Sequence, residues 1–146
     1  MLTKLAQDKI LLFWDEIKES IIQCIPSFGE KSQRALNVLL ESLLSNKVQA
    51  WVMYEEKDDK KILHAVIVTS FYYDIGTETK SLLIYAAYGY KYIVDEMWKD
   101  SVDTLKTFAK ANDCFRVLAF SSVPRVIQVA RMMGAKTDEV LLSLEV

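Results

Sequence analysis

The sequence predicts an α/β protein: a mixed β-sheet flanked by helices on both faces, in the order α-α-β-β-β-α-β-α-β. Three observations predict it. Apolar residues recur at helical spacing in four segments, short runs rich in β-branched and aromatic residues lie between them, and strands alternate with helices in the second half of the chain. That alternation implies crossover connections and some parallel pairing, whereas the three consecutive strands before it form an antiparallel meander.

Two helices come first. Residues 8–25 form an amphipathic helix that Pro26 ends, because proline lacks an N–H group and clashes with the preceding turn. Residues 32–45 form a second helix, with Ser32 as its N-cap and Asn46 in the left-handed conformation that ends a helix. Spacings of three and four residues define the apolar stripe of the first helix: Ile10, Phe13, Trp14, Ile17, Ile21 and Ile25.

Three strands follow, over residues 48–54, 61–71 and 80–87. The charged run 55–60 joins the first two as a hairpin, and Gly76 marks the turn before the third. The second half then alternates. It is expected to hold a helix over 92–111, a short buried strand over 114–120, a helix that Pro124 opens and Gly134 ends, and a last strand over 139–146.

Length and composition are typical of a single globular domain, with 146 residues of which 51% are hydrophobic and 26% charged. We expect residues 1–30 to add an N-terminal helix and turn to a core over 31–146. The formal net charge of −2 gives no general attraction to nucleic acid or to an anionic membrane. No uncharged apolar run is long enough to span a bilayer.

The content of cysteine and histidine argues against a metal site. Cys24 and Cys114 lie far apart in the sequence, outside any C-x-x-C pair, and the chain has one histidine. The apolar neighbours of both cysteines predict buried free thiols in a reducing compartment, so we expect a cytoplasmic protein.

This order of elements, with the helix end "ARMMGAK" before a last strand, resembles the GNAT superfamily of acyl-CoA-dependent N-acyltransferases. The resemblance implies acetyl-CoA or another acyl-CoA as cofactor and a small amine or peptide as substrate. It implies that the pantetheine arm pairs with the backbone where the fourth strand splays from the fifth. The pyrophosphate then lies on backbone N–H groups before the next helix, here at Ala86, Ala87, Tyr88, Gly89, Tyr90 and Lys91.

Several segments resemble, more closely, GNAT-like proteins encoded among bacteriophage genes. They are "LLFWDEI", "LLSNKVQAWVM", "LIYAAYGYKYIVDEMW", "FAKANDCFRVL" and "RVIQVARMMGAK". This resemblance implies a phage or prophage product, in the host cytoplasm or associated with the virion, with a component of the phage particle as its partner. The residues that match the pattern of that group are Trp14, Trp51, Gly89, Trp98, Cys114 and Arg125.

The sequence departs from the enzymatic pattern at two places. Residues 86–92 read "AAYGYKY", so Gly89 stands alone between two bulky tyrosines, without the second small residue or the preceding Arg or Gln of the family loop. Active members often carry a tyrosine acid four residues before the glycine that closes the last helix, and that position here is Ala130. Acyl transfer to an amine needs a base for the amine proton and an acid for the leaving thiolate.

Three residues are candidates for that chemistry, each with a simpler structural explanation. His64 is the one histidine and suits a base at neutral pH, but a histidine within an apolar strand is more often packed. Glu78 lies in a loop before the third meander strand, where acidic residues also serve solubility. Ser122 lies one position before Val123, where the family often has an asparagine.

Two hypotheses of function remain open from the sequence. The first is an N-acetyltransferase with a degenerate pyrophosphate loop. The second is a non-catalytic, GNAT-like phage or prophage protein that acts through protein–protein contacts. It would use the cleft that holds the cofactor in active family members, or a surface rich in tyrosine. The tyrosines concerned are Tyr72, Tyr73, Tyr85, Tyr88, Tyr90 and Tyr92.

Overall fold

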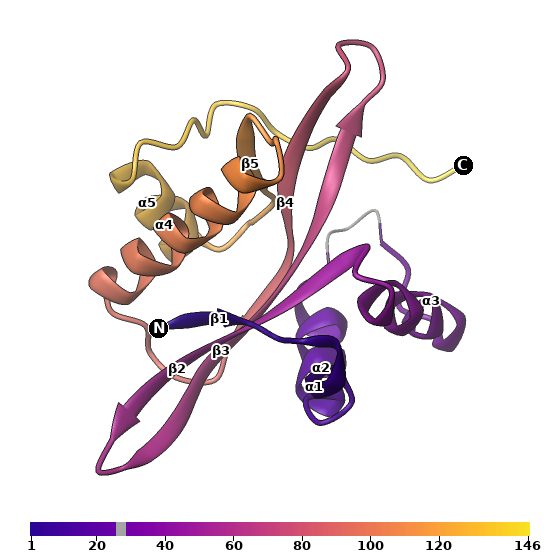
Figure 1. Cartoon of the computed structure of the whole chain (residues 1–146). Coiled ribbons are helices and arrows are strands. Elements are labelled where there is room, and N and C mark those ends of the chain that lie inside the picture. The colour runs from indigo at the N-terminus through magenta and orange to yellow at the C-terminus, as the bar shows by residue number, and fades with distance from the viewer. Residues whose placement is uncertain (26–28) are drawn as a thin grey trace.

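The computed structural model describes residues 1–25 and 29–146, and within them the strands form one five-stranded sheet in the order β1-β2-β3-β4-β5. Neighbouring strands are antiparallel, except that β4 and β5 are parallel (Figure 1), so the expected mixed sheet is confirmed. The strands are β1 (Leu2–Lys4), β2 (Val48–Lys57), β3 (Lys60–Asp74), β4 (Thr79–Gly89) and β5 (Arg116–Ala119).

Helices cover both faces of the sheet, as expected (Figure 1). The helices α2 and α3 pack on the face that carries Val52, Val66, Val68 and Ala86. Helix α4 packs on the opposite face, where the buried strand residues include Trp51, Met53, Ile67 and Leu82. The helices are α1 (Gln7–Ile10), α2 (Trp14–Cys24), α3 (Gln33–Leu44), α4 (Asp95–Ala111) and α5 (Pro124–Met132).

Local signals in the sequence explain several of these boundaries. The hydroxyl of Ser32 accepts a hydrogen bond of 3.1 Å from the N–H group of Ala35 and so caps α3 as expected. Asn46 follows α3 with a φ of 62°, also as expected. Asp58 and Asp59 form the two-residue tip between β2 and β3, both with positive φ, as a tight hairpin requires.

The N-terminal region differs from the expectation of one helix over 8–25. Two helices, α1 and α2, are separated by a turn at Leu11–Phe13, and Leu11 and Leu12 are exposed there. Apolar spacing did not reveal the break, because Ile10 and Ile17 reach the same core on either side of it. The expected stop at Pro26 lies outside the described residues. Strand β1 was not expected, and it pairs with residues 51–53 of β2.

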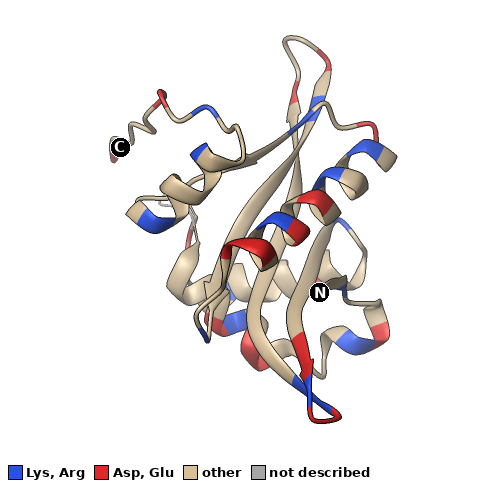
Figure 2. Ribbon diagram, turned by 90° about the vertical axis from the view of Figure 1, so that its left-hand side faces the viewer, with Lys and Arg blue, Asp and Glu red and all other residues tan. Residues whose placement is uncertain are grey.

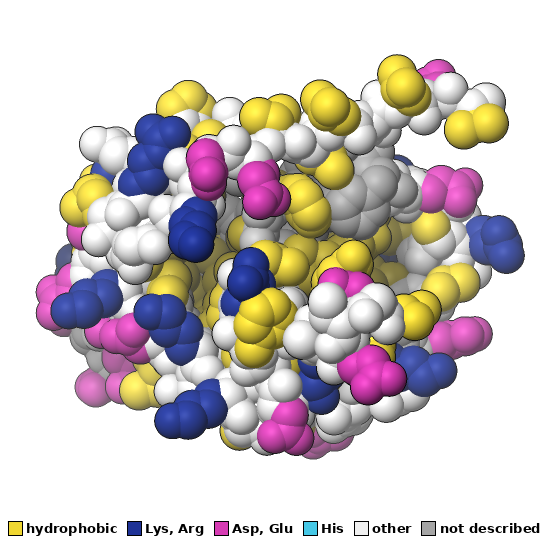
Figure 3. All heavy atoms as spheres, turned by 90° about the horizontal axis from the view of Figure 1, so that it is seen from above, with side chains coloured by type: hydrophobic (Ala, Val, Ile, Leu, Met, Phe, Trp, Pro, Cys, Tyr) yellow, Lys and Arg dark blue, Asp and Glu magenta, His cyan; other side chains and the backbone are white. Residues whose placement is uncertain are grey.

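The strand expected over 139–146 is wrong: the chain has no regular secondary structure after α5. Figure 3 shows this segment, with its apolar side chains in yellow, projecting from the body of the protein. Val140, Leu142 and Leu144 are 80%, 86% and 92% exposed. A strand needs a hydrogen-bonded neighbour, and no strand of the described chain pairs with this segment.

Candidate functional site

The end of strand β4 extends past the end of β5. The two strands pair from Ser81–Ile84 to Arg116–Ala119, and in the described chain β4 then continues to Gly89 with β3 alone as its neighbour. The free edge of β4, residues Tyr85–Gly89, is roughly 16 Å long at the usual rise of a strand. Because β4 and β5 are parallel, the loops that follow them, 90–94 and 120–123, leave the same end of the sheet.

A β-bulge at Tyr85 marks the point where the two strands part. Ile84 is opposite Thr69 and Ala86 is opposite Val68, so Tyr85 is the extra residue of β4. Tyr85 and Ala86 both pack on the α2–α3 side, whereas Ile84 packs on the α4 side. A bulge bends its strand, and this one begins where pairing with β5 ends. The bulge thus contributes to the separation of β4 from β5 that leaves this edge free.

The loop between β4 and α4 was expected to begin at Ala86, and the structure shifts it. Residues Ala86–Gly89 belong to β4, and only Tyr90 and Lys91 of the expected cradle lie in the loop. The N–H groups of Tyr90 and Lys91 both point to the carbonyl oxygen of His64, at 2.8 and 3.4 Å. These two amides therefore donate to β3 and are not open for a ligand, whereas the β5-side edge of Tyr85–Gly89 has no neighbouring strand in the described chain.

Gly89 leaves open space at the end of β4. A Cβ atom added there would meet its nearest neighbour, Cδ1 of Ile93, at 3.7 Å, which is ordinary contact. Packing within the chain therefore does not require glycine at this position. The absent side chain keeps the backbone accessible, as close approach of a ligand needs.

The tyrosines beside Gly89 do not crowd this edge as the sequence suggested. The hydroxyl of Tyr90 donates to the Glu19 carboxylate at 3.1 Å and to the Glu16 carbonyl oxygen at 3.3 Å. Its ring therefore lies against α2, and the ring of Tyr88 meets it edge to face at 5.1 Å. Burial, followed by the hydrogen bond to Glu19, raises the pKa of Tyr90, so the phenol stays protonated.

Arg125 connects the two loops at this end of the sheet, through a contact that was not expected from the sequence. Its guanidinium donates to the carboxylate of Asp95, the first residue of α4, and to the hydroxyl of Tyr92 at 3.4 Å. The parallel strands bring the first turns of α4 and α5 together, and each carries one of the opposite charges. That combination of parallel strands with charged first turns was the signal in the sequence that could have revealed the pair.

The charges at the N-terminus of α4 nearly cancel. Its first turn carries Asp95 and Glu96, seen in red at that end of the helix in Figure 2, while Lys91 and Arg125 supply two positive charges. The N-cap residue, Val94, has no side-chain hydrogen bond to the helix. The helix dipole favours an anion here, but the Asp95 carboxylate competes for that position. A phosphate would be bound weakly by charge alone.

A cavity of about 410 Å³ adjoins the free edge on the α2–α3 side of the sheet. Tyr85 belongs to both, since it is the first residue of the free edge and also lines the cavity. Burial raises the pKa of Tyr85, so its phenol is a neutral donor. The walls are mostly apolar, with charges and hydroxyls among them; they include Ile21, Leu39, Glu30, Arg34, Ser42 and Ser70.

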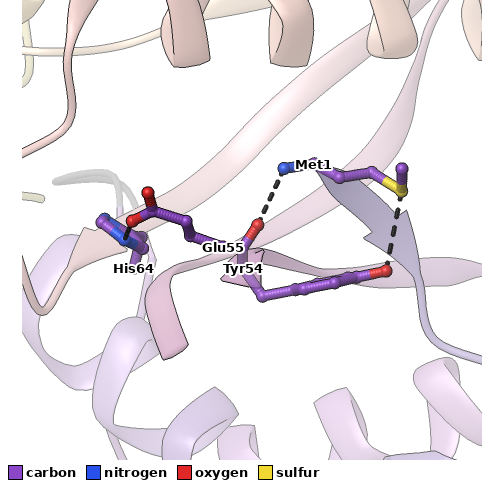
Figure 4. A network of polar contacts seen from close by, with 4 residues as sticks. All are labelled: Met1, Tyr54, Glu55 and His64. Carbon is purple, nitrogen blue, oxygen red and sulfur yellow. Dashed lines mark hydrogen bonds and ion pairs between the residues drawn. The ribbon is translucent and has the colours of Figure 1, made fainter. Parts of the chain in front are cut away.

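His64, the first of the catalytic candidates, faces away from the free edge. Its Nε2 atom lies 3.0 Å from Oε2 of Glu55 on β2, the strand on the other side of β3 from β4 (Figure 4). The ring is buried, and its Nδ1 atom has no hydrogen-bond partner among the described residues. The ring of His64 therefore belongs to the contact between β2 and β3. It is the backbone carbonyl of His64 that contacts the loop after Gly89.

The other two candidates lie at opposite ends of the sheet. Glu78 is exposed in the turn before β4, with a φ of 54°, and strand length puts it roughly 35 Å from Gly89. Ser122 is exposed in the loop after β5, at the same end of the sheet as Gly89.

Among the described residues no three His, Cys, Asp or Glu side chains gather as a metal site would need, and no helix is long and apolar enough to cross a membrane.

Solved structures resemble this chain along its whole length, although no protein-family model and no curated protein sequence matches it. A protein described as a probable acetyltransferase matches with a TM-score of 0.72 and 10% identity, over 100% of this chain and 97% of that one. A predicted acetyltransferase with acetyl-CoA, from Clostridium acetobutylicum, matches with a TM-score of 0.70 and 16% identity, over 99% and 95%.

The chain has the GNAT fold. A further structure with this fold is an aminoglycoside acetyltransferase from an uncultured soil metagenomic sample in complex with sisomicin. It matches with a TM-score of 0.70 and 13% identity, over 100% of this chain and 94% of that one. The GNAT fold expected from the sequence is thus confirmed. Identities this low establish the GNAT fold without the activity, because one fold hosts many functions.

Proposed function

We propose that this protein binds acetyl-CoA or a related acyl-CoA along the free edge of β4 and acts as an N-acetyltransferase. One observation carries the proposal: in the described chain β4 parts from β5 at the Tyr85 bulge and runs on to Gly89 with the edge on its β5 side unpaired, before the loop that leads to helix α4. One structure with the same fold, that from Clostridium acetobutylicum, was solved with acetyl-CoA.

The residues of the free edge fit an extended, amide-containing ligand. A pantetheine arm carries amide groups, and an unpaired strand edge presents the backbone N–H and C=O groups that such amides pair with. Gly89 has no side chain to block the approach, and of its neighbours Tyr90 lies against α2 while the ring of Tyr88 packs on that of Tyr90. At the far end of the edge, Lys91 and Arg125 would face the pyrophosphate, with Asp95 as the unfavourable neighbour.

The cavity beside Tyr85 is the proposed place for the amine that receives the acyl group. A bound acyl-CoA supplies an activated acyl group in thioester linkage. The chain itself would orient that group on β4 and hold the amine in a mostly apolar pocket. His64 and Glu78 are not proposed as the base, because the first faces Glu55 and the second lies at the other end of β4.

A non-catalytic role is the second candidate, and two observations favour it. Asp95 and Glu96 oppose a phosphate at α4, and two of the expected catalytic residues lie away from the free edge, since His64 faces Glu55 and Glu78 is at the other end of β4. In this alternative the GNAT fold serves a protein partner. That the partner is a component of a phage particle remains a prediction from the resemblance alone.

Calorimetric titration with acetyl-CoA separates the two candidates. The acyltransferase proposal expects binding with a dissociation constant in the micromolar range and at least a tenfold loss in Gly89→Trp, whose indole would cover the free edge. Gly76→Trp is the matched control, because Gly76 lies in the turn at the other end of the same strand. Absence of binding at millimolar acetyl-CoA, with the protein shown to be folded, would sink the proposal and leave the non-catalytic role.

A further inference from the structure

We propose that the cavity beside Tyr85 receives a hydrophobic α-amino acid, with its apolar side chain between α2, α3 and the sheet, its carboxylate at Arg34 and its ammonium group at Glu30. This inference names the amine that the proposed acyltransferase would acylate, so as an acceptor the amino acid rests on the proposed function. Binding of the amino acid itself can be measured without acyl transfer, and the two claims can therefore fail separately.

The interior of the cavity is mostly apolar. Its walls come from α2, from α3 and from the sheet, and Ile21 and Leu36 among them are buried. The hydroxyl of Ser42, which also lines the cavity, donates to the carbonyl oxygen of Val38 at 2.8 Å and is thereby satisfied. A ligand with hydroxyl or ammonium groups along its whole length would lose their hydration here without compensation. An aliphatic or aromatic side chain fits these walls, because it loses only its contact with water.

The chain before α3 approaches Tyr85 closely, which brings Glu30 to the end of the cavity near β4. A Cβ atom added to Gly29 would lie 3.1 Å from the hydroxyl oxygen of Tyr85, so the backbone runs directly against the phenol. Glu30 is the next residue and lines the cavity. Tyr85 is also the first residue of the free edge of β4, which would orient the acyl group. An ammonium group attracted to Glu30 therefore lies at the end of the cavity where the acyl group would be.

Arg34 provides a site for the carboxylate. It is the second residue of α3, and the first turn of that helix contains no acidic residue. The positive end of the helix dipole therefore adds to the charge of the guanidinium group, in contrast to α4, where Asp95 and Glu96 oppose an anion. A guanidinium group binds a carboxylate through two parallel hydrogen bonds, so a carboxylate is the anion that fits best here.

The two charged residues among those that line the cavity have opposite signs, and this selects the charges of the ligand. Glu30 and Arg34 are four residues apart, and neither forms an ion pair within the described chain. A polyamine would be repelled by Arg34, and a carboxylic acid without an amine would be repelled by Glu30. An α-amino acid carries one charge of each sign on the same carbon atom, together with a single side chain for the interior.

Acyl transfer to such a ligand balances without a further co-reactant. The ammonium group first loses one proton. Its nitrogen then forms a bond to the acyl carbon while the bond from that carbon to sulfur breaks, and a second nitrogen proton ends on the sulfur. The products are an N-acyl amino acid, the free thiol and one proton. The N-acyl amino acid has no positive charge for Glu30 to attract, which favours its release.

Two-dimensional ¹H–¹⁵N spectra of the full chain, titrated with L-leucine and with L-phenylalanine, test the binding. They are recorded with and without coenzyme A, which carries no acyl group and so permits no turnover. We expect saturable shifts at Val48, Ser70, Tyr85 and α3, with a dissociation constant of about 1 mM or below for at least one of the two amino acids. Leucinamide lacks the carboxylate, 4-methylpentanoate lacks the amine and spermidine is a polycation, so each is expected to bind at least fivefold more weakly.

Matched variants test the two charges separately. Arg34→Gln is expected to weaken binding of the amino acid at least fivefold and to leave binding of leucinamide unchanged. Its control is Lys31→Gln, exposed outside the lining of the cavity, which is expected to change neither. Glu30→Gln is expected to weaken binding of the amino acid and to strengthen binding of 4-methylpentanoate, because the repulsion is removed. Its control is Glu41→Gln, exposed on α3 and also outside the lining.

Three results would overturn the proposal. They are spectra that neither amino acid changes at about 20 mM, leucinamide binding as tightly as leucine, and binding that Arg34→Gln and Lys31→Gln affect equally. Titration with acetyl-CoA is the separate test of the proposed function. Shifts with an amino acid but none with acetyl-CoA would keep this ligand for the cavity and remove the acyl transfer. Binding of acetyl-CoA, with no shifts from either amino acid in the presence of coenzyme A, would keep the acyltransferase and remove this acceptor.

Discussion

Arg125, in the first turn of α5, donates to the carboxylate of Asp95, the first residue of α4. This pair joins the two loops that leave the sheet at the end of β4 and β5. It also sets the charge at the place where the proposed pyrophosphate site lies. Asp95 occupies the positive end of the α4 dipole and repels a phosphate, while Arg125 offsets that repulsion.

The Arg125–Asp95 pair predicts opposite effects for its two members on acetyl-CoA binding. Asp95→Asn removes the competing charge and should tighten binding roughly two- to fivefold, the range of a single charge at a helix N-terminus. Arg125→Gln leaves Asp95 unpaired and should weaken binding by a similar factor. Asp103→Asn, in the middle of α4, and Lys106→Gln are the controls, measured by the same calorimetric titration. Weaker binding in Asp95→Asn would place the phosphates elsewhere.

A second prediction concerns the buried ring of His64. Glu55→Ala removes the partner of Nε2 and should lower the free energy of unfolding by about 1–2 kcal/mol, because a buried polar group is left without a hydrogen bond. Glu56→Ala, exposed at the next position, should change it by less than about 0.5 kcal/mol. Urea unfolding measures both. Acetyl-CoA affinity should be the same in Glu55→Ala as in the wild type. A large loss of affinity in this variant would mean that His64 takes part in binding the ligand.

Three buried side chains form a polar chain across β2 and β3. The indole N–H of Trp51 donates to Oγ1 of Thr69, and that hydroxyl donates to Oε1 of Gln49, both at 2.9 Å. Thr69→Val keeps the shape but leaves both partners unsatisfied, so it should cost roughly 2–3 kcal/mol. Thr107→Val on the exposed face of α4 is the control, compared by urea midpoint. Equal midpoints for the two variants would show that this chain of hydrogen bonds contributes nothing to stability.

Tyr90 predicts a loss of stability at alkaline pH. Its pKa in the folded protein is raised above the ordinary value of 10, first by burial and then by Glu19. The unfolded chain therefore releases the phenol proton first as pH increases, so the stability from this group is complete below pH 10 and is lost above it. Thermal unfolding of wild type and Tyr90→Phe between pH 8 and 11 should show a steeper decline in the wild type. Parallel curves would mean that Tyr90 is no more protonated than in the unfolded chain.

The sequence predicted most of the architecture because its local signals agree with the fold. The Ser32 cap, the Pro124 start and the three meander strands all lie where propensity and turn chemistry put them. The break at Leu11 was not predicted, because apolar spacing continues across it. Strand β1 was not predicted either, because a three-residue edge strand has no pattern of its own. The expected strand over 139–146 is apolar but pairs with no strand of the described residues, and a strand is defined by its partner.

The candidate site was predicted less well, for a physical reason. The free edge of β4 arises from where β5 stops and from the bulge at Tyr85, and both depend on long-range pairing that a sequence does not display. The place of Gly89 at the end of β4 stays a prediction of a ligand site, whereas the ring of His64 faces β2 and Glu78 lies at the far turn. Distances between residues remote in sequence decide these assignments.

Two-dimensional ¹H–¹⁵N spectra of the backbone amides, recorded during titration with acetyl-CoA, would show whether acyl-CoA pairs with the free edge of β4. We expect the largest shifts on Tyr85–Gly89 and on the first turn of α4, with β1 and the turn at Gly76 unchanged. Spectra that do not change at millimolar acetyl-CoA, or shifts that cluster away from β4, would contradict it.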